Sequence, residues 1–284
     1  MAAGARQHGS APRTLLTLLI PPAILVAGWF LQPRWGWLAM MALLVAFIVL
    51  VGQHLAGPWQ GALIDERNKM SLSRFQTIVW TVLVVAAFLA AALHNIRTGQ
   101  PDPLRIAIPS QLWALLGISV TSLVGSGLVK QEKTKRKPEP HNAKKTLAGA
   151  LTGVDPATVT PADGNQLVAA KHPEAPSADD PVVARGVLTV NEDPAASSWS
   201  DLFRGEEVGN AGHLDLGKIQ MFYFTLIIVF AYAAALGSLF AQLFAQQSGI
   251  TAFPALGNDV VALLGISHAT YLTTKAVTRT PAIS

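Results

Sequence analysis

The chain has 284 residues, of which 51% are hydrophobic and only 13% are charged, whereas charged residues make up about a quarter of an ordinary soluble domain. The mean hydropathy is positive, at +0.38. This composition excludes an ordinary soluble domain and indicates an integral membrane protein. The sequence contains no cysteine, which excludes disulfides, thiolate metal sites and cysteine nucleophiles.

Six stretches with at most one charged residue approach the length of about 20 residues that a helix needs to cross a hydrocarbon core of about 30 Å. They are residues 14–31, 35–52, 75–93, 109–129, 219–242 and 257–274. We therefore predict an all-α membrane protein with six transmembrane helices. The first stretch could instead be a signal peptide, because Arg6 and Arg13 precede it. We favour an uncleaved span, since it contains Pro21-Pro22 and no clear small-residue cleavage site follows it.

Basic residues set the predicted orientation, because Lys and Arg beside the spans stay on the cytoplasmic side. With both termini in the cytoplasm, 18 of the 21 basic residues fall in cytoplasmic segments, and only Arg34, Arg97 and Arg105 fall outside. This orientation places the loop 130–215 in the cytoplasm. The predicted parts are an N-terminal hairpin (1–56), repeat 1 (57–130), a disordered cytoplasmic linker (131–198), repeat 2 (199–277) and a tail (278–284).

The hexapeptide ALLGIS occurs twice, at residues 114–119 and 262–267. Upstream of it, Arg74, Gln76 and Thr81 recur as Lys218, Gln220 and Thr225 at a constant offset of 144. A stripe of small residues recurs as well: Gly117, Thr121 and Gly125 correspond to Gly265, Ala269 and Thr273. Small residues spaced by four permit close packing of membrane helices. The sequence therefore predicts a duplicated hairpin whose two copies enter from the same side, related by an axis along the membrane normal.

The strings SLSRFQTIVWT, WSDLFRGEEVGN, LDLGKIQMFYFT and LLGISHATYLTTKA carry a resemblance to a known group. The chain resembles bacterial membrane proteins with SLSR-x-Q…WT and LLGIS…YL…K hairpin repeats, over roughly residues 59–129 and 199–277. No activity is established for that group, so the resemblance implies a fold and a location in the bacterial cytoplasmic (inner) membrane, and no catalytic residue. A membrane receptor or effector associated with a contractile injection system is a further alternative.

The charge of the long hydrophilic loop is divided. Residues 130–145 carry seven basic and two acidic side chains, and residues 146–215 carry three basic and eleven acidic ones. The basic cluster predicts contacts with anionic lipid headgroups through Lys130, Lys133, Lys135, Arg136, Lys137, Lys144 and Lys145. A stop-transfer flank that obeys the positive-inside rule explains the same cluster.

The middle of this loop is rich in Pro, Ala and Asp and buries too little apolar area to offset its ordering entropy, so it is expected to be a disordered tether. Order is expected to return near Ser198, which could cap a short helix. That helix would place Trp199, Leu202 and Phe203 together on the membrane surface.

Polar side chains inside the predicted spans are the candidate site residues: Gln76, Thr81, Ser119, Gln220, Thr225, Ser267 and His268. Hydrogen bonding between helices is the favoured interpretation, and a polar pathway through the membrane is the alternative. His268 could serve in proton or pH sensing. Its counterpart in the first repeat is Val120, so a symmetric proton path is not supported.

No nucleotide loop, zinc-type His spacing or nucleophile elbow is present in the sequence, and no catalytic residue, cofactor or metal is predicted. Acidic and amide residues before each repeat could hold a divalent cation through oxygen ligands, although capping and ion pairing explain them equally well. These residues are Glu66, Asn68, Glu206, Glu207 and Asn210.

The favoured function is a non-enzymatic membrane anchor or assembly platform for a cytoplasmic protein partner, bound through the loop. The alternative is a channel or small-solute transporter. The predicted partners are the lipid bilayer, including anionic lipids, and a cytoplasmic protein. A homo-oligomer is open, and no nucleic-acid partner is expected.

Overall fold

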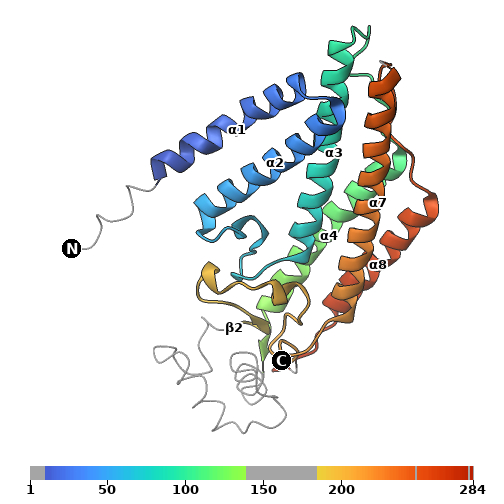
Figure 1. Ribbon diagram of the computed structural model, residues 1–284. Helices are drawn as coiled ribbons and strands as arrows, with labels where there is room; N and C mark the ends of the chain where they lie inside the picture. The colour runs from blue at the N-terminus through green and yellow to red at the C-terminus, as the bar shows by residue number, and fades with distance from the viewer. Residues whose placement is uncertain (1–9, 139–183, 247, 281, 284) are drawn as a thin grey trace. The chain divides into compact units, whose positions relative to one another are not determined.

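A computed structural model of the chain describes residues 10–138, 184–246, 248–280 and 282–283. These residues are mostly helical (Figure 1). The long helices are α1 (Ser10–Phe30), α2 (Pro33–Ala56), α3 (Leu72–Arg97), α4 (Ser110–Thr134), α7 (Leu216–Gln246) and α8 (Asn258–Ala276). The short elements are the 3-10 helices η1 (Gly61–Leu63), η3 (Pro194–Ala196) and η4 (Trp199–Leu202) and the strands β1 (Lys137–Pro138), β2 (Ala184–Arg185), β3 (Leu188–Thr189) and β4 (Ala282–Ile283).

Each predicted span lies within one of these helices, apart from single residues at the ends of three spans. Within the described ranges, four helical segments are long and apolar enough to cross a bilayer: α2, α3, α4 and Leu216–Gln242 of α7. The apolar part of α1, Thr14–Phe30, is shorter, and α8 is outside this group. The prediction of a mostly helical fold is confirmed, whereas the membrane crossings of α1 and α8 stay predictions.

The chain divides into two compact units. Unit 1 comprises Met1–Ala62, Arg74–Ser119 and Phe224–Gly265, and unit 2 comprises Leu63–Ser73, Val120–Tyr223 and Ile266–Ser284. Four helices, α3, α4, α7 and α8, supply residues to both units. This division therefore runs across the predicted hairpins instead of separating one hairpin from the other.

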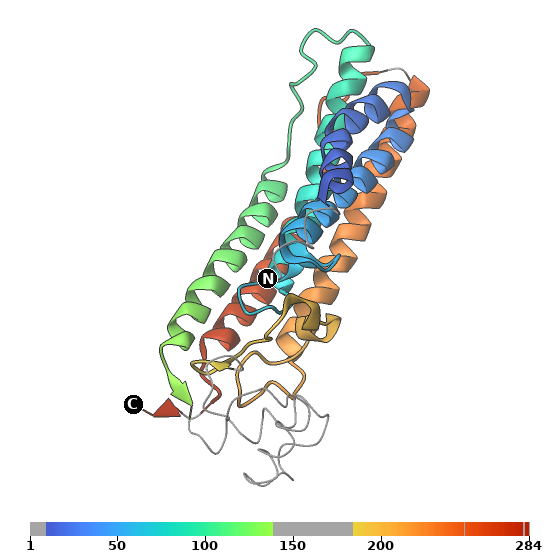
Figure 2. The same cartoon turned by 90° about the vertical axis from the view of Figure 1, so that its left-hand side faces the viewer.

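The core of unit 1 is built from small and aromatic side chains. In α3, Ala86, Ala87 and Ala91 are fully buried, and small side chains of this kind let helices approach closely. The rings of Trp37 and Phe240, both buried, lie 5.4 Å apart. In the same unit α1 and α2 form an antiparallel pair (Figures 1 and 2).

A close backbone approach holds the segment after α2 against that helix. A Cβ atom added to Gly61 would stand 2.2 Å from the carbonyl oxygen of Gly52, and one added to Gly52 would stand 2.4 Å from the backbone nitrogen of Ala62. Both obstacles are backbone atoms, which cannot turn aside as a side chain would. Glycine is therefore required at both positions.

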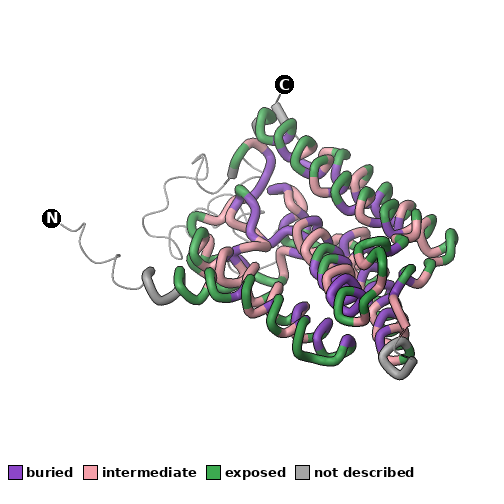
Figure 3. The backbone as a smooth tube through the Cα atoms, turned by 90° about the horizontal axis from the view of Figure 1, so that it is seen from above, coloured by how far each residue is buried: buried purple, intermediate pink, exposed green. Residues whose placement is uncertain are grey.

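Buried and exposed residues alternate along the long helices, which gives each an inward and an outward face (Figure 3). The predicted small-residue stripe does not lie on the inward face. Gly117, Thr121, Ala269 and Thr273 are exposed, and a Cβ added to Gly117 would meet no atom within 4 Å. The other two members, Gly125 and Gly265, are half-buried and lie near Leu272 and Ile118.

The reason for this difference is polarity, which the prediction of the stripe did not weigh. On α4 the inward positions are held by polar residues: Ser119, Ser122, Ser126, Lys130 and Lys133 are all buried. Polar groups need partners inside the protein when the surroundings are apolar. The small apolar residues are consequently left on the outward face.

Two parts of the predicted disordered linker (131–198) have defined structure in unit 2. Residues 131–138 complete α4 and form β1, and residues 184–198 form the β2–β3 hairpin and η3. Val187 and Leu188 are fully buried there. Their burial offsets the conformational entropy lost when this part of the linker becomes ordered, which the prediction from composition did not include. The rest of that linker, 139–183, lies outside the described residues.

The predicted cap before repeat 2 is confirmed. Ser198 accepts from the backbone of Ser200, and Asp201 completes a capping box at the start of η4. Leu202 is fully buried, whereas Trp199 stays exposed. The prediction that Trp199, Leu202 and Phe203 share one surface is therefore wrong for Leu202, which packs into unit 2.

Candidate functional site

A buried ion-pair core occupies unit 2, and it begins in the loop before α3. The side chain of Asp65 accepts hydrogen bonds from the backbone nitrogens of Arg67 (3.0 Å) and Lys69 (3.4 Å), which closes the loop around it. Its second oxygen, Oδ2, then receives the guanidinium of Arg67 at 2.9 Å and the ammonium of Lys130 at 2.6 Å. All three side chains are no more than 6% exposed.

Glu206 is the second anion of this core. Its Oε1 atom lies 2.8 Å from Lys275 Nζ, 3.0 Å from Lys218 Nζ and 3.5 Å from Arg67 Nη2. Arg67 therefore links the Asp65 and Glu206 carboxylates. Two carboxylates thus face four cations in the core, which we define as Asp65, Arg67, Lys130, Glu206, Lys218 and Lys275.

Burial and charge act in opposite directions on the two carboxylates. Burial alone would raise the pKa of Asp65, but the positive charges of Arg67 and Lys130 lower it far below its ordinary value. Burial opposes ionisation of Glu206 in the same way, and Lys218, Lys275 and Arg67 hold its pKa well below the usual range. Both carboxyl groups are therefore charged at neutral pH. Their lowered pKa values stabilise the fold at every pH above the pKa that each group has in the unfolded chain.

Two lysines, Lys69 and Lys133, lie at the edge of the core. Burial lowers the pKa of Lys69 to about 8, an effect that Asp201, whose carboxylate lies 3.9 Å away, only partly offsets. A second ion pair next to the core joins Lys133 to Glu207 at 2.5 Å. Glu207 also accepts from the backbone nitrogens of Arg279 and Thr280, which fixes the chain after α8.

A row of buried polar contacts joins α4 to α8 within unit 2. Ser122 Oγ lies 2.6 Å from His268 Nδ1, and Lys275 Nζ donates to Ser126 Oγ (2.6 Å) and to Tyr271 Oη (2.8 Å). His268 thus has a hydroxyl partner on the neighbouring helix. Beside these contacts lies a cavity of about 20 Å³ bordered by Glu206, Lys218 and Lys275, and that volume suits about one water molecule.

The two predicted glutamines differ in environment. Gln76 is fully buried and donates from Nε2 to Thr225 Oγ1 at 2.6 Å, inside unit 1. Gln220 and Thr81, the repeat counterparts of that pair, are exposed. Ser119 and Ser267 are buried. The structure therefore brings together Gln76 with Thr225, and leaves Gln220 and Thr81 on the outward side.

Replacing Gln76 by leucine is expected to destabilise the chain by about 0.6 to 2 kcal/mol, the range for a hydrogen bond between membrane helices. Gln220→Leu is the matched control, because it makes the same change at the exposed counterpart, and it should leave the unfolding temperature unchanged. Thermal unfolding of both variants in detergent checks this. Equal effects of the two substitutions would contradict the assigned partner.

The predicted headgroup contacts are not all available to lipid, and here the prediction needs correction. Lys130 and Lys133 are buried and paired with carboxylates, because the loops before α3 and α7 supply anions that the prediction did not place. The exposed residue Lys135 pairs with Glu132, and Arg136 donates to Thr278. Lys137 lies in β1, and Lys144 and Lys145 lie outside the described residues.

Three of the residues considered for a divalent cation have other partners. Glu206 and Glu207 are neutralised by lysines, and the side-chain oxygen of Asn210 accepts from the backbone of Glu207. Within the described ranges, no group of three or more His, Asp or Glu side chains could hold a metal ion. The ion pairs of this cluster connect the loops before α3 and α7 to the helices α4, α7 and α8.

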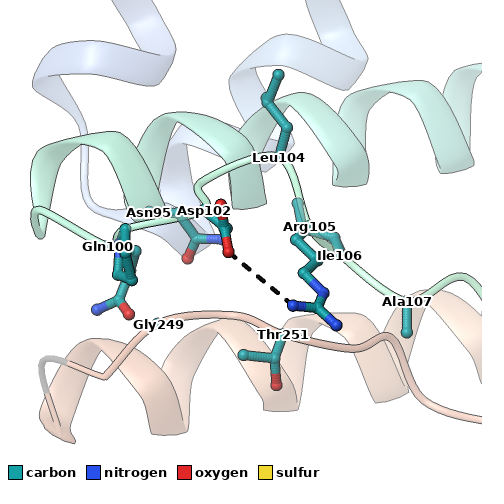
Figure 4. Close-up of a pocket in the computed structure, with 10 residues that line it drawn as sticks. Asn95, Gln100, Asp102, Leu104, Arg105, Ile106, Ala107, Gly249 and Thr251 are labelled. Carbon is teal, nitrogen blue, oxygen red and sulfur yellow. Dashed lines mark ion pairs between the residues drawn. The ribbon is translucent and has the colours of Figure 1, made fainter.

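Unit 1 carries a separate pocket of about 540 Å³ where the segment after α3 meets the segment before α8 (Figure 4). Asn95 holds its floor: its Nδ2 donates to the carbonyls of Pro103 (3.0 Å) and Ile250 (2.9 Å), and its Oδ1 accepts from Ile250 N (2.7 Å). Asp102 and Arg105 lie at the rim, and their charged groups are 4.0 Å apart (Figure 4).

Sequence reasoning missed most of these residues. A signal for the buried face of α4 was available, because Ser119, Ser122, Ser126, Lys130 and Lys133 recur at intervals of three and four and so share one side of a helix. The partners of Lys130 and Lys275 had no such signal, since Asp65 and Glu206 reach them only through tertiary packing. Nothing in the sequence marks Asn95 as a residue that organises a pocket.

No family model, curated protein or solved structure matches the chain. The class therefore rests on the molecule itself. In the part of the chain that the structure describes, four helices have the length and composition to cross a bilayer. Large apolar side chains on outward faces, such as Leu128, Ile227 and Phe230, are exposed. An apolar surface of this extent suits lipid and not water, so the chain is a helical membrane protein.

Proposed function

We propose that this protein is a non-enzymatic anchor of the bacterial cytoplasmic membrane, which holds a cytoplasmic protein partner through residues 139–183. In this proposal six helices cross the bilayer, both termini lie in the cytoplasm, and α3–α4 and α7–α8 are two copies of one hairpin in like orientation. The positive-inside distribution of basic residues supports this orientation.

The duplicated hairpin is supported by matching starts and matching loops. Helices α3 and α7 begin at Leu72 and Leu216, which are 144 positions apart, and α4 and α8 begin at Ser110 and Asn258, which are 148 apart. Those are the offsets of the two sequence matches. The loops also correspond: Ser71 N donates to Leu63 O before α3, and Asp215 N donates to Phe203 O before α7.

The hairpin tips provide a further correspondence, which the sequence comparison overlooked. Ala107 and Ala252 form a parallel bridge in unit 1. They lie in the similar tripeptides Ala107-Ile108-Pro109 and Ala252-Phe253-Pro254. Equivalent segments of two like-oriented copies run in the same direction, as these two do.

Exposed tryptophans near the ends of the helices support a membrane setting. Trp29, Trp35 and Trp113 lie at the ends of α1, α2 and α4 that would be on the extracytoplasmic side. Trp59 and Trp199 lie in the segments that would be on the cytoplasmic side. All five are at least 44% exposed. Tryptophan is enriched at both membrane–water interfaces, where the ring meets the lipid headgroups.

The anchor proposal is carried by the way unit 2 holds both ends of residues 139–183. The chain enters this segment directly after α4 and β1 and returns at β2. Val187 N donates to Lys133 O, and the Lys133 ammonium is tied to Glu207. A partner that bound residues 139–183 would therefore be attached to unit 2 through both ends of this segment, and unit 2 is stabilised by buried ion pairs.

The anchor is preferred over a channel because two buried pairs of polar side chains inside the predicted spans bond each other. Gln76 is bonded to Thr225, and His268 to Ser122. Gln220, a residue of the alternative pathway, is exposed on the outward side. The cavity next to Lys275 has room for about one water molecule, which is too little for a solute.

The test replaces residues 141–181 by a Gly/Ser linker of equal length and leaves the packed residues 184–198 in place. A control keeps the composition of the segment but scrambles its order. We expect both variants to unfold at the temperature of the parent chain and the proteins crosslinked to the parent in cells to be lost from both. An unchanged set and amount of crosslinked proteins in the Gly/Ser variant would refute the anchor proposal.

A further inference from the structure

The pocket of unit 1 has the size of a small-molecule site. Its volume is about 540 Å³, and ligand sites in proteins usually measure about 300 to 1,000 Å³. None of the residues predicted from the sequence lines it, and the anchor proposal does not use it. Its walls come from both hairpin tips, residues 95–107 on one side and residues 249–251 on the other.

The walls are fixed before any ligand arrives. The three hydrogen bonds of the Asn95 side chain tie the two segments together. Ala107 N also donates to Thr251 O (2.8 Å), and Phe253 N donates to Ala107 O (3.0 Å). A preformed pocket loses little entropy when it takes up a ligand.

Two opposite charges stand at the rim of this pocket. Arg105 Nη1 lies 4.0 Å from Asp102 Oδ2, and the side chains are 84% and 69% exposed. An exposed pair of this kind is worth about 0 to 1 kcal/mol, so a ligand can separate it at little cost. Figure 4 shows the Arg105 side chain extending across the pocket toward Thr251.

The chemistry of the rim selects a ligand with two charges. A guanidinium binds a carboxylate through two parallel hydrogen bonds, and the Asp102 carboxylate can accept from an ammonium group. In an α-amino acid these two groups are attached to the same carbon atom, a separation that suits charges 4.0 Å apart. Leu104 and Ile106 add apolar lining for a side chain.

We propose that the hairpin tips bind a free α-amino acid with an apolar side chain, its carboxylate on Arg105 and its ammonium on Asp102. Under the orientation proposed above, the pocket faces the extracytoplasmic side. The binding itself does not depend on that orientation or on the partner of residues 139–183. Failure of the anchor proposal would leave this site standing.

The experiment measures binding to the full chain in lipid nanodiscs. The common α-amino acids are titrated individually to about 10 mM, a range that covers affinities as weak as about −4 kcal/mol. L-leucine is the reference probe, with N-acetyl-L-leucine and L-leucinamide as analogues that each lack one charge. We expect at least one apolar amino acid to bind saturably. Its N-acetyl and amide analogues should bind at least about tenfold more weakly.

Two variants locate the site. Arg105→Gln and Asp102→Asn, both at exposed positions, should leave the ligand-free unfolding temperature unchanged and weaken binding by about tenfold or more. Arg34→Gln is the control, because Arg34 is exposed but stacks on Trp35 outside the pocket. The proposal is overturned if no apolar amino acid binds, or if binding survives both rim substitutions.

Discussion

Glu206→Gln is expected to destabilise unit 2 by about 3 to 5 kcal/mol, the cost of leaving buried charges without their partner. The neutral amide would face three cations, Lys218, Lys275 and Arg67, all of them buried. Chemical or thermal unfolding in detergent, followed by circular dichroism, measures the loss.

The control for this prediction is Glu132→Gln. Glu132 forms an ion pair of 2.6 Å with Lys135, but both side chains are more than 60% exposed. Exposed pairs contribute about 0 to 1 kcal/mol, so this substitution should change stability by less than 1 kcal/mol. Similar losses of stability for Glu132→Gln and Glu206→Gln would contradict the prediction, because the buried ion pairs of Glu206 would then contribute no more than an exposed pair.

Asp65→Asn is expected to have the second-largest effect, again about 3 to 5 kcal/mol, because Arg67 and Lys130 both bond the Asp65 carboxylate. The variant Asp65→Asn combined with Lys130→Met removes one of the stranded cations. It should therefore be more stable than Asp65→Asn alone, which is a positive coupling between neighbouring sites. The unfolding free energies of the two single variants and the double variant give this coupling.

If the double variant lost the sum of the two single losses, Lys130 would not depend on Asp65, contrary to the contact of 2.6 Å between them. Lys135→Met serves as the control partner, since Lys135 is exposed and bonds Glu132 instead. Combined with Asp65→Asn, it should add its own small effect and no more.

The helices could be predicted from the sequence because their signal is local. An uncharged stretch of about 20 residues indicates a span wherever it packs, and the helix starts Leu72 and Leu216 keep the offset of 144 found between the repeats. The cap at Ser198 was equally local, since Ser198 and Asp201 are three residues apart.

The ion-pair core could not be predicted, because its partners are far apart in the chain. Lys275 is 69 residues from Glu206, and Lys130 is 65 residues from Asp65. The basic cluster after residue 129 indicated attraction to headgroups, and only the fold shows that Lys130 and Lys133 turn to carboxylates instead. On the inward side of α4 the sequence predicted Ser119 but not Ser122 or Ser126, whose partners His268 and Lys275 are 146 and 149 residues away.

The repeat also hides differences between its copies. Gln76 is buried and Gln220 is exposed, and His268 is buried where its counterpart Val120 is exposed. Each copy therefore packs with a different face. The sequence match predicted equal roles for Gln76 and Gln220, and burial assigns the interhelical contact to Gln76 alone.

The most direct test of the proposed topology uses single cysteines, because the natural chain has none to remove. Ala170→Cys lies in the segment 139–183, and Leu104→Cys and Thr251→Cys lie at the two hairpin tips, where both residues are exposed. In intact cells a membrane-impermeant maleimide should label the two tips and spare position 170 until the membrane is permeabilised. Labelling of position 170 in intact cells, or of only one tip, would contradict two like-oriented hairpins with a cytoplasmic connecting segment.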